Sequence, residues 1–339
     1  MSEGFLTLGI ESSCDETSAA VVKNGKQVLS NVIASQIDWH RKFGGVVPEI
    51  ASRKHVELMN PVIEEALVKA GVDFTDLSAV AVTYGPGLVG GLLVGIAAAK
   101  SIAYTHDLPL VAVNHIEGHI YANFISHPQL EPPVVCLTVS GGHTDLLYFE
   151  ELGTYQILGR TRDDAAGEAF DKIARVMEIG YPGGPAIDKL ATAGDAEAID
   201  LPRPLVDEAS YDFSFSGLKT AVLNYINNQK QRGEEISKPD LAASFQQAVV
   251  DVLKSKVTKA AYDKEVNQVI LSGGVAANSQ LQRELEKELT KVGIEFCYPE
   301  LKLCTDNAAM IASAGYFNWQ HNKEEAPFTL NANPSLKLK

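Results

Sequence analysis

The chain has 339 residues, enough for about two domains, since an ordinary domain has on the order of 150. Hydrophobic residues make up 45% and charged residues 21%, which excludes a disordered chain, a fibrous repeat and a small disulfide scaffold. There are 29 Lys and Arg against 43 Asp and Glu, so the formal charge of −14 argues against a protein that grips nucleic acid unaided.

Several features favour a cytoplasmic protein without membrane association. The longest apolar run, 88–99, stops at Lys100 and is shorter than the ~18 residues that a membrane span needs. The N-terminal residues 1–4 carry no basic segment, so we expect no secretory signal. The four cysteines are scattered without a CxxC pair, which fits a reducing compartment and disfavours a thiolate zinc site.

The first half of the chain opens with a predicted three-strand meander. Its apolar runs at 5–10, 18–22 and 28–33 are separated by a polar turn and by Asn24-Gly25, a strong hairpin signal. The later elements of this half are a helix at 56–67, a strand at 80–83, a glycine turn with an apolar helix, a strand at 110–113 and a helix from His115.

The second half repeats this order. Apolar runs at 134–139, 146–149 and 155–158 predict a second meander whose first turn is 140–143. After it come a helix at 241–252, a strand at 269–271, a helix at 281–289, a strand at 294–297 and a helix at 307–317. The order βββαβαβα thus occurs twice, which predicts a duplicated α/β architecture.

We therefore expect two domains, 1–130 and 131–325, followed by a poorly ordered tail at 326–339. A segment of roughly 163–240, rich in Gly, Pro and charge, is inserted in the second domain. Long insertions in compact folds tend to be functional. Two domains of this kind create a cleft, and ligands usually bind in such clefts.

Two glycine turns are candidates for anion binding. Ser140–His143 and Ser272–Val275 follow predicted strands, and small residues there let backbone N–H groups approach a nucleotide or an acyl phosphate. A single Gly-Gly pair often serves only a sharp turn, but two pairs at matched positions of a duplicated frame favour binding.

Two other motif matches are weak. Gly85–Gly90 fits the GxGxxG dinucleotide fingerprint, but it lies in the second unit of its half, and the small residues of the next helix suggest packing against the other domain. Ser216–Lys219 fits SxxK, but the companion motifs of the penicillin-recognising enzymes are absent.

The strongest chemical signal is the segment His115-Ile116-Glu117-Gly118-His119. Histidines four residues apart lie on one helix face and can share a metal ion. The spacing of Glu117 differs from that of the zincin HExxH motif. Asp306, at the start of the last helix, is the expected third ligand, because the duplication places it across the cleft. Such a set leaves open coordination positions, as catalytic metals require; the alternative is a pair of hydrogen-bonded histidines on an exposed face.

Taken together, the motifs resemble those of the bacterial TsaD family of tRNA threonylcarbamoyladenosine transferases, formerly described as O-sialoglycoprotein endopeptidases (Gcp). The resemblance covers about residues 5–320 and implies the actin/Hsp70/sugar-kinase (ASKHA, ribonuclease H-like) superfold. The motifs that carry it are GIESSCDET (9–17), GGVVPE (44–49), HIEGH (115–119), VSGGHT (139–144), GEAFDK (167–172), YPGGP (181–185), FSFSGLKT (213–220) and GGVAAN (273–278).

The resemblance implies transfer of a threonylcarbamoyl group from threonylcarbamoyl-AMP to the exocyclic amine of the adenosine 3′ of the anticodon, in tRNAs that read codons beginning with A, with release of AMP. It also implies roles for individual residues. His115, His119 and Asp306 would hold one divalent metal ion, iron or else zinc, and Asp15 and Glu16 would lie near the reacting group. The adenine nucleotide, with a possible Mg²⁺ ion, would contact Val139, Ser140, Gly141, Gly142, His143, Asp171, Gly184, Asp188 and Asn278.

The chemistry is consistent with these roles. A metal with open positions polarises a carbonyl, glycine-turn amides hold a phosphate, and a carboxylate such as Asp15 can take the proton of a poorly nucleophilic aromatic amine. A solvated hairpin turn is the alternative explanation for Asp15 and Glu16.

The resemblance further implies partners: a metal-free paralogue, TsaB, bound through the first domain, an ATPase, TsaE, and a synthase that makes the adenylate. The stretch 56–67 is a candidate dimer face or an ordinary core helix. An acidic chain that acts on tRNA needs a local basic patch, for which Arg41, Lys42, Arg53 and Lys54 are candidates, or contacts from its partners.

Three other functions remain open at this point. A metallopeptidase would use the same histidines but lacks a water-activating Glu at the required spacing. A sugar or acetate kinase would share the fold. A non-catalytic subunit like the paralogue should lack HxxxH, so the presence of His115 and His119 argues against it.

Overall fold

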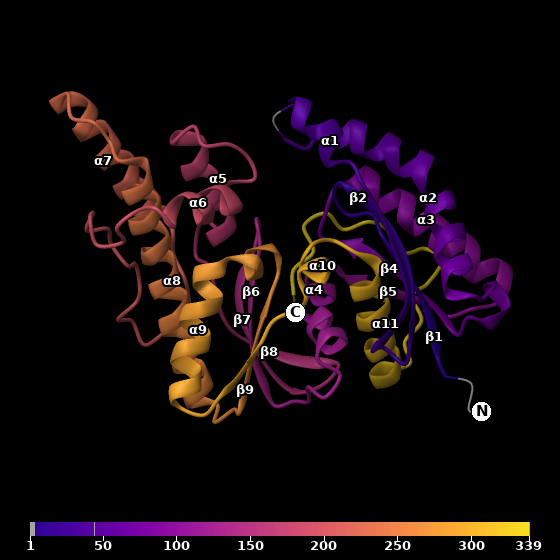
Figure 1. Ribbon diagram of the computed structural model, residues 1–339. Helices are drawn as coiled ribbons and strands as arrows, with labels where there is room; N and C mark the ends of the chain where they lie inside the picture. Colours follow the sequence, from indigo (N-terminus) through magenta and orange to yellow (C-terminus); the bar gives the residue numbers. More distant parts are fainter. Residues whose placement is uncertain (1–3, 44, 339) are drawn as a thin grey trace. The chain divides into compact units, whose positions relative to one another are not determined.

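The structure, a computed structural model, describes residues 4–43 and 45–338, so Gly44 of the motif 44–49 and residues 1–3 lie outside the described residues (Figure 1). The chain forms two compact units. Unit 1 comprises Met1–Leu130 and Pro299–Lys339, and unit 2 comprises Glu131–Tyr298. Among the described residues, no helix is both long and apolar enough to cross a membrane.

Unit 1 is built on a mixed five-stranded sheet in the order β3-β2-β1-β4-β5. Strands β1 (Leu6–Glu11), β2 (Glu16–Lys23) and β3 (Gln27–Ser35) form the predicted antiparallel meander, and β4 (Ala79–Gly85) and β5 (Leu110–Asn114) extend it in parallel. The hairpin between β2 and β3 turns at Asn24 and Gly25, whose φ angles of 52° and 69° suit these two residue types.

Helices cover both faces of this sheet. Helices α2 (Pro48–Ala70) and α3 (Val89–His106) share a core with Leu8 and Ile10, whereas Gly9 between them faces α11 (Ala308–Asn322), because side chains alternate along a strand. Helix α4 (His115–Ser126) packs against α11. The short helix α1 (Ile37–His40), the 3-10 turn Arg41–Phe43 and a second 3-10 turn at Phe74–Asp76 complete the first segment.

The second unit ends earlier than expected. It stops at Tyr298, whereas the sequence predicted a second domain of 131–325, and Pro299–Lys339 belongs to unit 1. Helix α11 contacts β1, β2 and β4 of unit 1, and α10 (Leu301–Cys304) contacts α4. The tail after Ala326 is packed rather than loose. The Asn333 N–H donates to the Tyr84 carbonyl at 2.8 Å, and Leu336 and Leu338 are buried. Two apolar side chains near the end of the chain are the reason that it docks.

Unit 2 repeats the mixed sheet in the order β10-β9-β6-β7-β8. Its strands are β6 (Val134–Val139), β7 (Thr144–Glu151), β8 (Thr154–Arg160), β9 (Gln268–Ser272) and β10 (Glu295–Cys297). Its helices are α5 (Ala166–Val176), α6 (Gly183–Ala191), α7 (Ser216–Arg232), α8 (Lys238–Asp263) and α9 (Ser279–Lys291), with a 3-10 turn at Gly274–Ala277. The twice-repeated βββαβαβα order and the helical insertion, α5 to α7, agree with the predicted α/β class.

Both weak motifs have structural roles. The side chains of Ser216 and Lys219 bind different carboxylates, those of Asp163 and Asp164, so they do not form a nucleophile–base pair. In the GxGxxG region, a Cβ at Gly87 would lie 2.5 Å from the Ser13 carbonyl oxygen. The glycines around α3 therefore allow close packing against a turn of the same unit, and the expectation that they pack against the other domain is wrong.

Candidate metal centre and nucleotide-binding loops

Two histidines of the predicted metal site lie at the start of α4. This helix begins directly after β5, where the Asn114 side chain accepts a hydrogen bond from the Ile116 N–H at 2.8 Å and so caps it. The spacing of four residues brings the rings of His115 and His119 to one side of the helix, with centroids 4.8 Å apart. Both imidazoles are thereby held by regular secondary structure.

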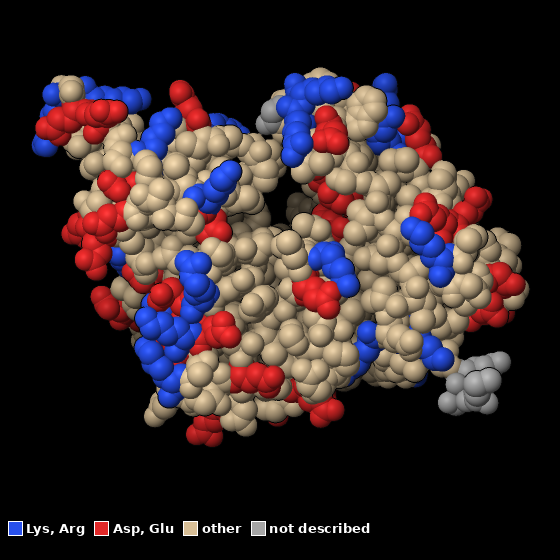
Figure 2. All heavy atoms as spheres, viewed as in Figure 1, with Lys and Arg blue, Asp and Glu red and all other residues tan. Residues whose placement is uncertain are grey.

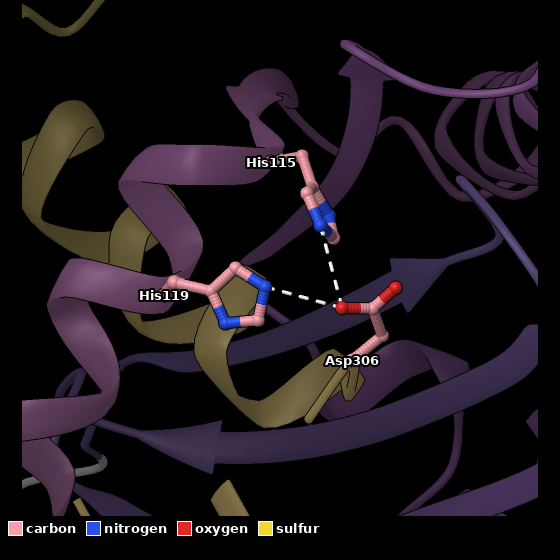
Figure 3. A group of neighbouring side chains, drawn as sticks. All are labelled: His115, His119 and Asp306. Atoms are coloured by element: carbon pink, nitrogen blue, oxygen red, sulfur yellow. Dashed lines mark hydrogen bonds and ion pairs between the residues drawn. The ribbon is translucent and has the colours of Figure 1, made fainter. Parts of the chain in front are cut away.

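Asp306 meets these histidines from the other end of the chain. It precedes α11, whose first turn is capped by Asn307. Its Oδ1 lies 3.1 Å from Nε2 of His119 and 3.4 Å from Nε2 of His115 (Figure 3). The potential ligand atoms of the three residues all lie within 4.8 Å of one another. The structure thus brings the three residues together within unit 1, whereas the sequence analysis expected Asp306 to belong to the second domain.

Glu11 is a fourth member of this cluster, and sequence reasoning assigned it no role. Its carboxylate at the end of β1 is fully buried and accepts hydrogen bonds from Ser13 N–H (2.5 Å) and Thr83 Oγ1 (2.6 Å). Its Oε2 also lies 3.0 Å from Nδ1 of His115. A charged residue that ends an apolar strand was the available signal, because such a group is rarely buried without partners.

The charges of this cluster favour a cation at its centre. Burial alone would raise the pKa of Asp306, but the two imidazoles hold that pKa far below its usual value. Burial would lower the pKa of His115, but Asp306 and Glu11 raise it well above its usual value. A proton on His115 therefore balances two carboxylates in the metal-free chain.

The donor set fits a divalent transition metal, since two imidazole nitrogens and one carboxylate oxygen converge. With Nδ1 of His115 bound to Glu11, Nε2 is the ring atom directed at Asp306. Metal-binding histidines commonly use such a carboxylate on the far ring nitrogen to set their orientation.

Asp15 lies on the turn between β1 and β2, and Glu16 is the first residue of β2. This turn is fixed from β3, because Gln36 N–H donates to the Asp15 carbonyl at 2.9 Å and Ser35 Oγ donates to Glu16 Oε1 at 3.0 Å. Burial, together with the charges of Asp306 and Asp15, raises the pKa of Glu16 to about 9. The Glu16 carboxyl group therefore lies within the electrostatic reach of the metal cluster.

His55 of α2 supports the same turn from behind, and sequence reasoning missed it. The buried ring contacts Thr17 Oγ1 through Nδ1 at 2.8 Å and the Cys14 carbonyl through Nε2 at 3.0 Å. Since a carbonyl can only accept, Nε2 carries the proton and Nδ1 accepts from Thr17. Burial lowers the pKa of His55, which keeps this neutral arrangement.

In unit 2, the two predicted glycine turns lie at the carboxyl ends of two neighbouring inner strands of the sheet. Strands β6 and β9 are parallel neighbours, so the turns after Val139 and after Ser272 follow corresponding strand ends. The side chain of Val139 is buried, whereas residues 140–143 of the turn are partly or fully exposed and can meet a ligand. A Cβ at Gly141 or Gly142 would meet nothing within 4 Å, so a phosphate can approach this backbone closely.

Of the other expected nucleotide residues, Asp171, Gly184 and Asp188 lie on helices α5 and α6, and Asn278 caps the start of α9. Asp171 of α5 accepts a hydrogen bond from the Gly183 N–H at 2.7 Å, which joins it to the start of α6, and Gly184 has open space at its Cβ position. Burial raises the pKa of Asp171.

Asp188 and Asn278 are joined through Gln246, a buried residue of α8 that sequence reasoning missed. Nε2 of Gln246 donates to Asp188 Oδ1 at 3.0 Å, and its Oε1 accepts from Asn278 Nδ2 at 2.9 Å. Asp188 also accepts from the Ser279 N–H at 3.2 Å. The network holds both expected nucleotide residues in one orientation.

Comparisons with known proteins agree with this architecture. The sequence model of the TsaD family, described as tRNA N6-adenosine threonylcarbamoyltransferase, matches residues 27–313. Two relatives with that name, from Clostridioides difficile (strain 630) and Clostridium perfringens (strain 13 / Type A), are each 58% identical over 334 residues, which is 98% of this chain and 98% of theirs.

Solved structures show the same fold at low identity. Full-length HypF in its phosphate- and nucleotide-bound form has a TM-score of 0.64 at 16% identity, over 94% of this chain and 47% of that one. HypF of T. kodakarensis has a TM-score of 0.62 at 15% identity, over 94% of this chain and 48% of that one. These likenesses support the actin-like fold alone. The family match and the two relatives show that this chain belongs to the TsaD family of tRNA N6-adenosine threonylcarbamoyltransferases.

Proposed function

We propose that this protein transfers the threonylcarbamoyl group from threonylcarbamoyl-AMP to N6 of the adenosine 3′ of the anticodon, in tRNAs that read codons beginning with A, and releases AMP. Near full-length identity of 58% to relatives named for this transfer carries the proposal. The gathering of His115, His119 and Asp306 into one cluster, in which His119 is buried and the other two are partly exposed, supports it.

We assign the metal to that cluster, with iron as the expected ion and zinc as the alternative. When bound, such an ion supplies Lewis-acid polarisation of the carbonyl group to be transferred. His115 and His119 would donate through Nε2, and Asp306 through Oδ1. Glu11 holds the proton of His115 at Nδ1, which leaves Nε2 free as a ligand.

Asp15 is the carboxylate that we assign as general base. The amine of adenine must lose a proton as the new bond forms, and a positioned carboxylate can accept it. Glu16 is less suited in the metal-free chain, since a pKa of about 9 keeps it protonated near neutral pH. His55 and Gln36 position the backbone of this turn through the carbonyls of Cys14 and Asp15.

Residues of unit 2 would bind the adenylate, with Mg²⁺ as a possible companion ion. The turn Ser140–His143 suits the phosphate, which is also the leaving group, because the N–H groups of Gly142 and His143, which donate to Ser140 Oγ at 3.4 and 3.1 Å, can donate to a phosphate oxygen in its place. Asp171, Gly184, Asp188 and Asn278 suit the adenosine, because they offer carboxylate, amide and open glycine surfaces. Open backbone at Gly141 and Gly142 supports this assignment.

The proposed partners are a TsaB-like paralogue, a TsaE-like ATPase and a synthase that supplies threonylcarbamoyl-AMP, all in the cytoplasm. In the expected dimer stretch 56–67, most apolar side chains belong to the core, including those of Met59 and Ile63. Val56 and Val68, at 67% and 80% exposure, are large apolar side chains of α2 that are available for the paralogue.

Mass spectrometry of tRNA nucleosides tests the transfer directly. The chain, its synthase and its partners are incubated with unmodified tRNA, threonine, bicarbonate and ATP, and the threonylcarbamoyl nucleoside is measured. We expect the product to disappear when this chain is omitted or carries His119→Ala, and to persist with His321→Ala, a matched change at an exposed histidine.

Two results would contradict the proposal. One is that the highly purified chain hydrolyses peptides in a chelator-sensitive reaction while the tRNA remains unmodified, which would indicate a metallopeptidase. The other is phosphoryl transfer from ATP to a small molecule without tRNA, which would indicate a kinase of the same fold.

A further inference from the structure

An exposed apolar cluster lies on the segment that joins β3 to α2. Ile37, Trp39 and Phe43 are exposed at 38%, 50% and 59%, within seven residues of one another. Single exposed apolar residues are ordinary, but neighbouring aromatic side chains in solvent usually mark a contact surface. The segment is anchored beneath by the buried His40, whose Nδ1 accepts from the Val47 N–H at 3.2 Å.

Cationic side chains surround Trp39. The Nζ atoms of Lys42 and Lys54 lie 5.2 Å and 4.7 Å from the centroid of its ring, so the first turns of α2 meet α1 there. Arg41 and Arg53 are exposed nearby in sequence. Figure 2 shows Lys and Arg side chains gathered over the end of unit 1 where α1 lies, with acidic side chains beside them.

Two acidic side chains partly offset these cations. Asp38 pairs with Arg41 at 3.2 Å and Glu57 pairs with Lys54 at 2.6 Å. Surface pairs of this kind are weak and exchange readily, so a phosphate can replace either carboxylate. In a chain of net charge −14, a local group of cations beside an aromatic ring is the feature that a polyanion can use.

The cluster is continuous with the turn that carries Asp15 and Glu16. Ser35, which bonds Glu16, and Gln36, whose N–H bonds the Asp15 carbonyl, directly precede Ile37. A substrate whose reacting atom lies at that turn must place its neighbouring groups nearby. For an adenosine in a single-stranded loop, those neighbours are unpaired bases and phosphates.

We propose that α1, the turn Arg41–Phe43 and the start of α2 form a surface for single-stranded RNA, on which Trp39 stacks with an unpaired base of the tRNA anticodon loop. Lys42 and Lys54 then move from the ring to the flanking phosphates. Aromatic stacking with adjacent cations is how proteins hold single strands. Three apolar side chains are few for a protein interface, which needs roughly 20–30 residues a side. This inference rests on the proposed function for its choice of RNA.

The two tryptophans of the chain, Trp39 and Trp319, allow a direct test. In the Trp319→Phe variant, fluorescence reports on Trp39 alone. The probe is a 17-nucleotide anticodon stem-loop RNA for a codon beginning with A, titrated into the full chain, with a blunt RNA duplex of equal length as the comparison. We expect saturable quenching by the stem-loop and weaker quenching by the duplex. The Trp39→Phe variant, in which only Trp319 emits, should show none.

Affinity measurements by filter binding give a second readout. Trp39→Ala should weaken stem-loop binding by about 5- to 150-fold, as expected for losing one stacked base. Lys42→Ala and Lys54→Ala should each lower the slope of log affinity against log salt by roughly 0.7. The matched control is Lys323→Ala, whose Nζ lies 5.4 Å from the ring of Trp319, and it should change neither value.

Unchanged Trp39 emission at saturating RNA, or a Trp39→Ala variant that binds as tightly as the parent chain, overturns the proposal. Quenching by the paralogue but not by RNA also overturns it and assigns the surface to a protein. If the modified nucleoside forms but the fluorescence of Trp39 does not change with RNA, the surface is refuted and the proposed function stands. RNA-dependent quenching without any nucleoside product would refute the proposed function and keep the surface.

Discussion

Replacing Glu11 with Gln changes one atom next to the metal cluster and tests how His115 is oriented. The Glu11 carboxylate accepts from Ser13 N–H and Thr83 Oγ1, and its Oε2 lies 3.0 Å from Nδ1 of His115. In Gln, the oxygen that faces Ser13 can be kept, but an NH₂ group then faces His115. Nδ1 of His115 then accepts from this NH₂ group and the ring proton stays on Nε2, the atom that lies 3.4 Å from Asp306; Ser13 Oγ, 3.1 Å from Nδ1, can donate or accept and fits either tautomer.

The expected effect is a loss of metal affinity by about 10- to 100-fold, the usual range for removing a hydrogen-bond partner of a metal ligand. This corresponds to about 1.4–2.7 kcal/mol. In the parent chain a proton stays on Nδ1, held by Glu11, after Nε2 has released its own; in Glu11→Gln the remaining ring proton stays on Nε2, where it competes with the metal. Thr83→Val is the matched control, because it removes another donor to Glu11 and leaves the bond to His115 in place.

Calorimetric titration of Zn²⁺ into the metal-free protein, with a competing chelator, measures this difference. Thermal unfolding of each metal-free variant checks that it folds. A Glu11→Gln protein that is folded and binds Zn²⁺ within twofold of the parent chain would refute the reasoning. An equal loss in Thr83→Val would show that the carboxylate acts through packing rather than through the tautomer of His115.

Three further substitutions test other parts of the structure. Burial and two neighbouring carboxylates raise the pKa of Glu16 from 4.5 to about 9, so its contribution to stability is complete below pH 4.5 and is lost as the pH rises through 9. In the presence of a chelator, the urea midpoint of the parent chain should therefore fall from pH 6 to 9.5, and this fall should be smaller in Glu16→Gln. Gln246→Glu faces Asp188 with a second carboxylate in place of a donor and should weaken AMP binding about tenfold by calorimetric titration; an unchanged affinity would show that Gln246 does not position Asp188 for the nucleotide. Gly9→Ala places a Cβ 2.3 Å from a carbonyl of α11 and should cost about 1–3 kcal/mol of unfolding free energy in urea, whereas Gly141→Ala, with open space, should cost little.

The elements that local rules govern were predictable from the residues in order. Apolar periodicity and the Asn24-Gly25 turn gave the meander of unit 1, since hairpin geometry depends on adjacent residues. The spacing of His115 and His119 placed both rings on one side of α4, because a helix repeats every 3.6 residues. In each case the informative positions are a few residues apart.

The partners of these residues were not predictable in the same way. Glu11 touches His115 across 104 positions of sequence, and Gln246 touches Asp188 across 58. Neither pair follows a spacing rule. The position of Glu11 at the end of an apolar strand indicates that the carboxylate has partners, but not which residues these are. Only the folded chain shows that their polar atoms are enclosed and paired.

Composition, strand and helix periodicity and the two histidines of one helix were thus determined by the sequence itself, because each depends on side chains close together along the chain. The tertiary structure alone decided that α11 packs on the first sheet, at the place where Gly9 has no side chain to obstruct it. This packing brings Asp306 to the histidines. The physical reason is that burial of distant apolar surfaces selects which elements meet, and that choice is made by the whole chain at once.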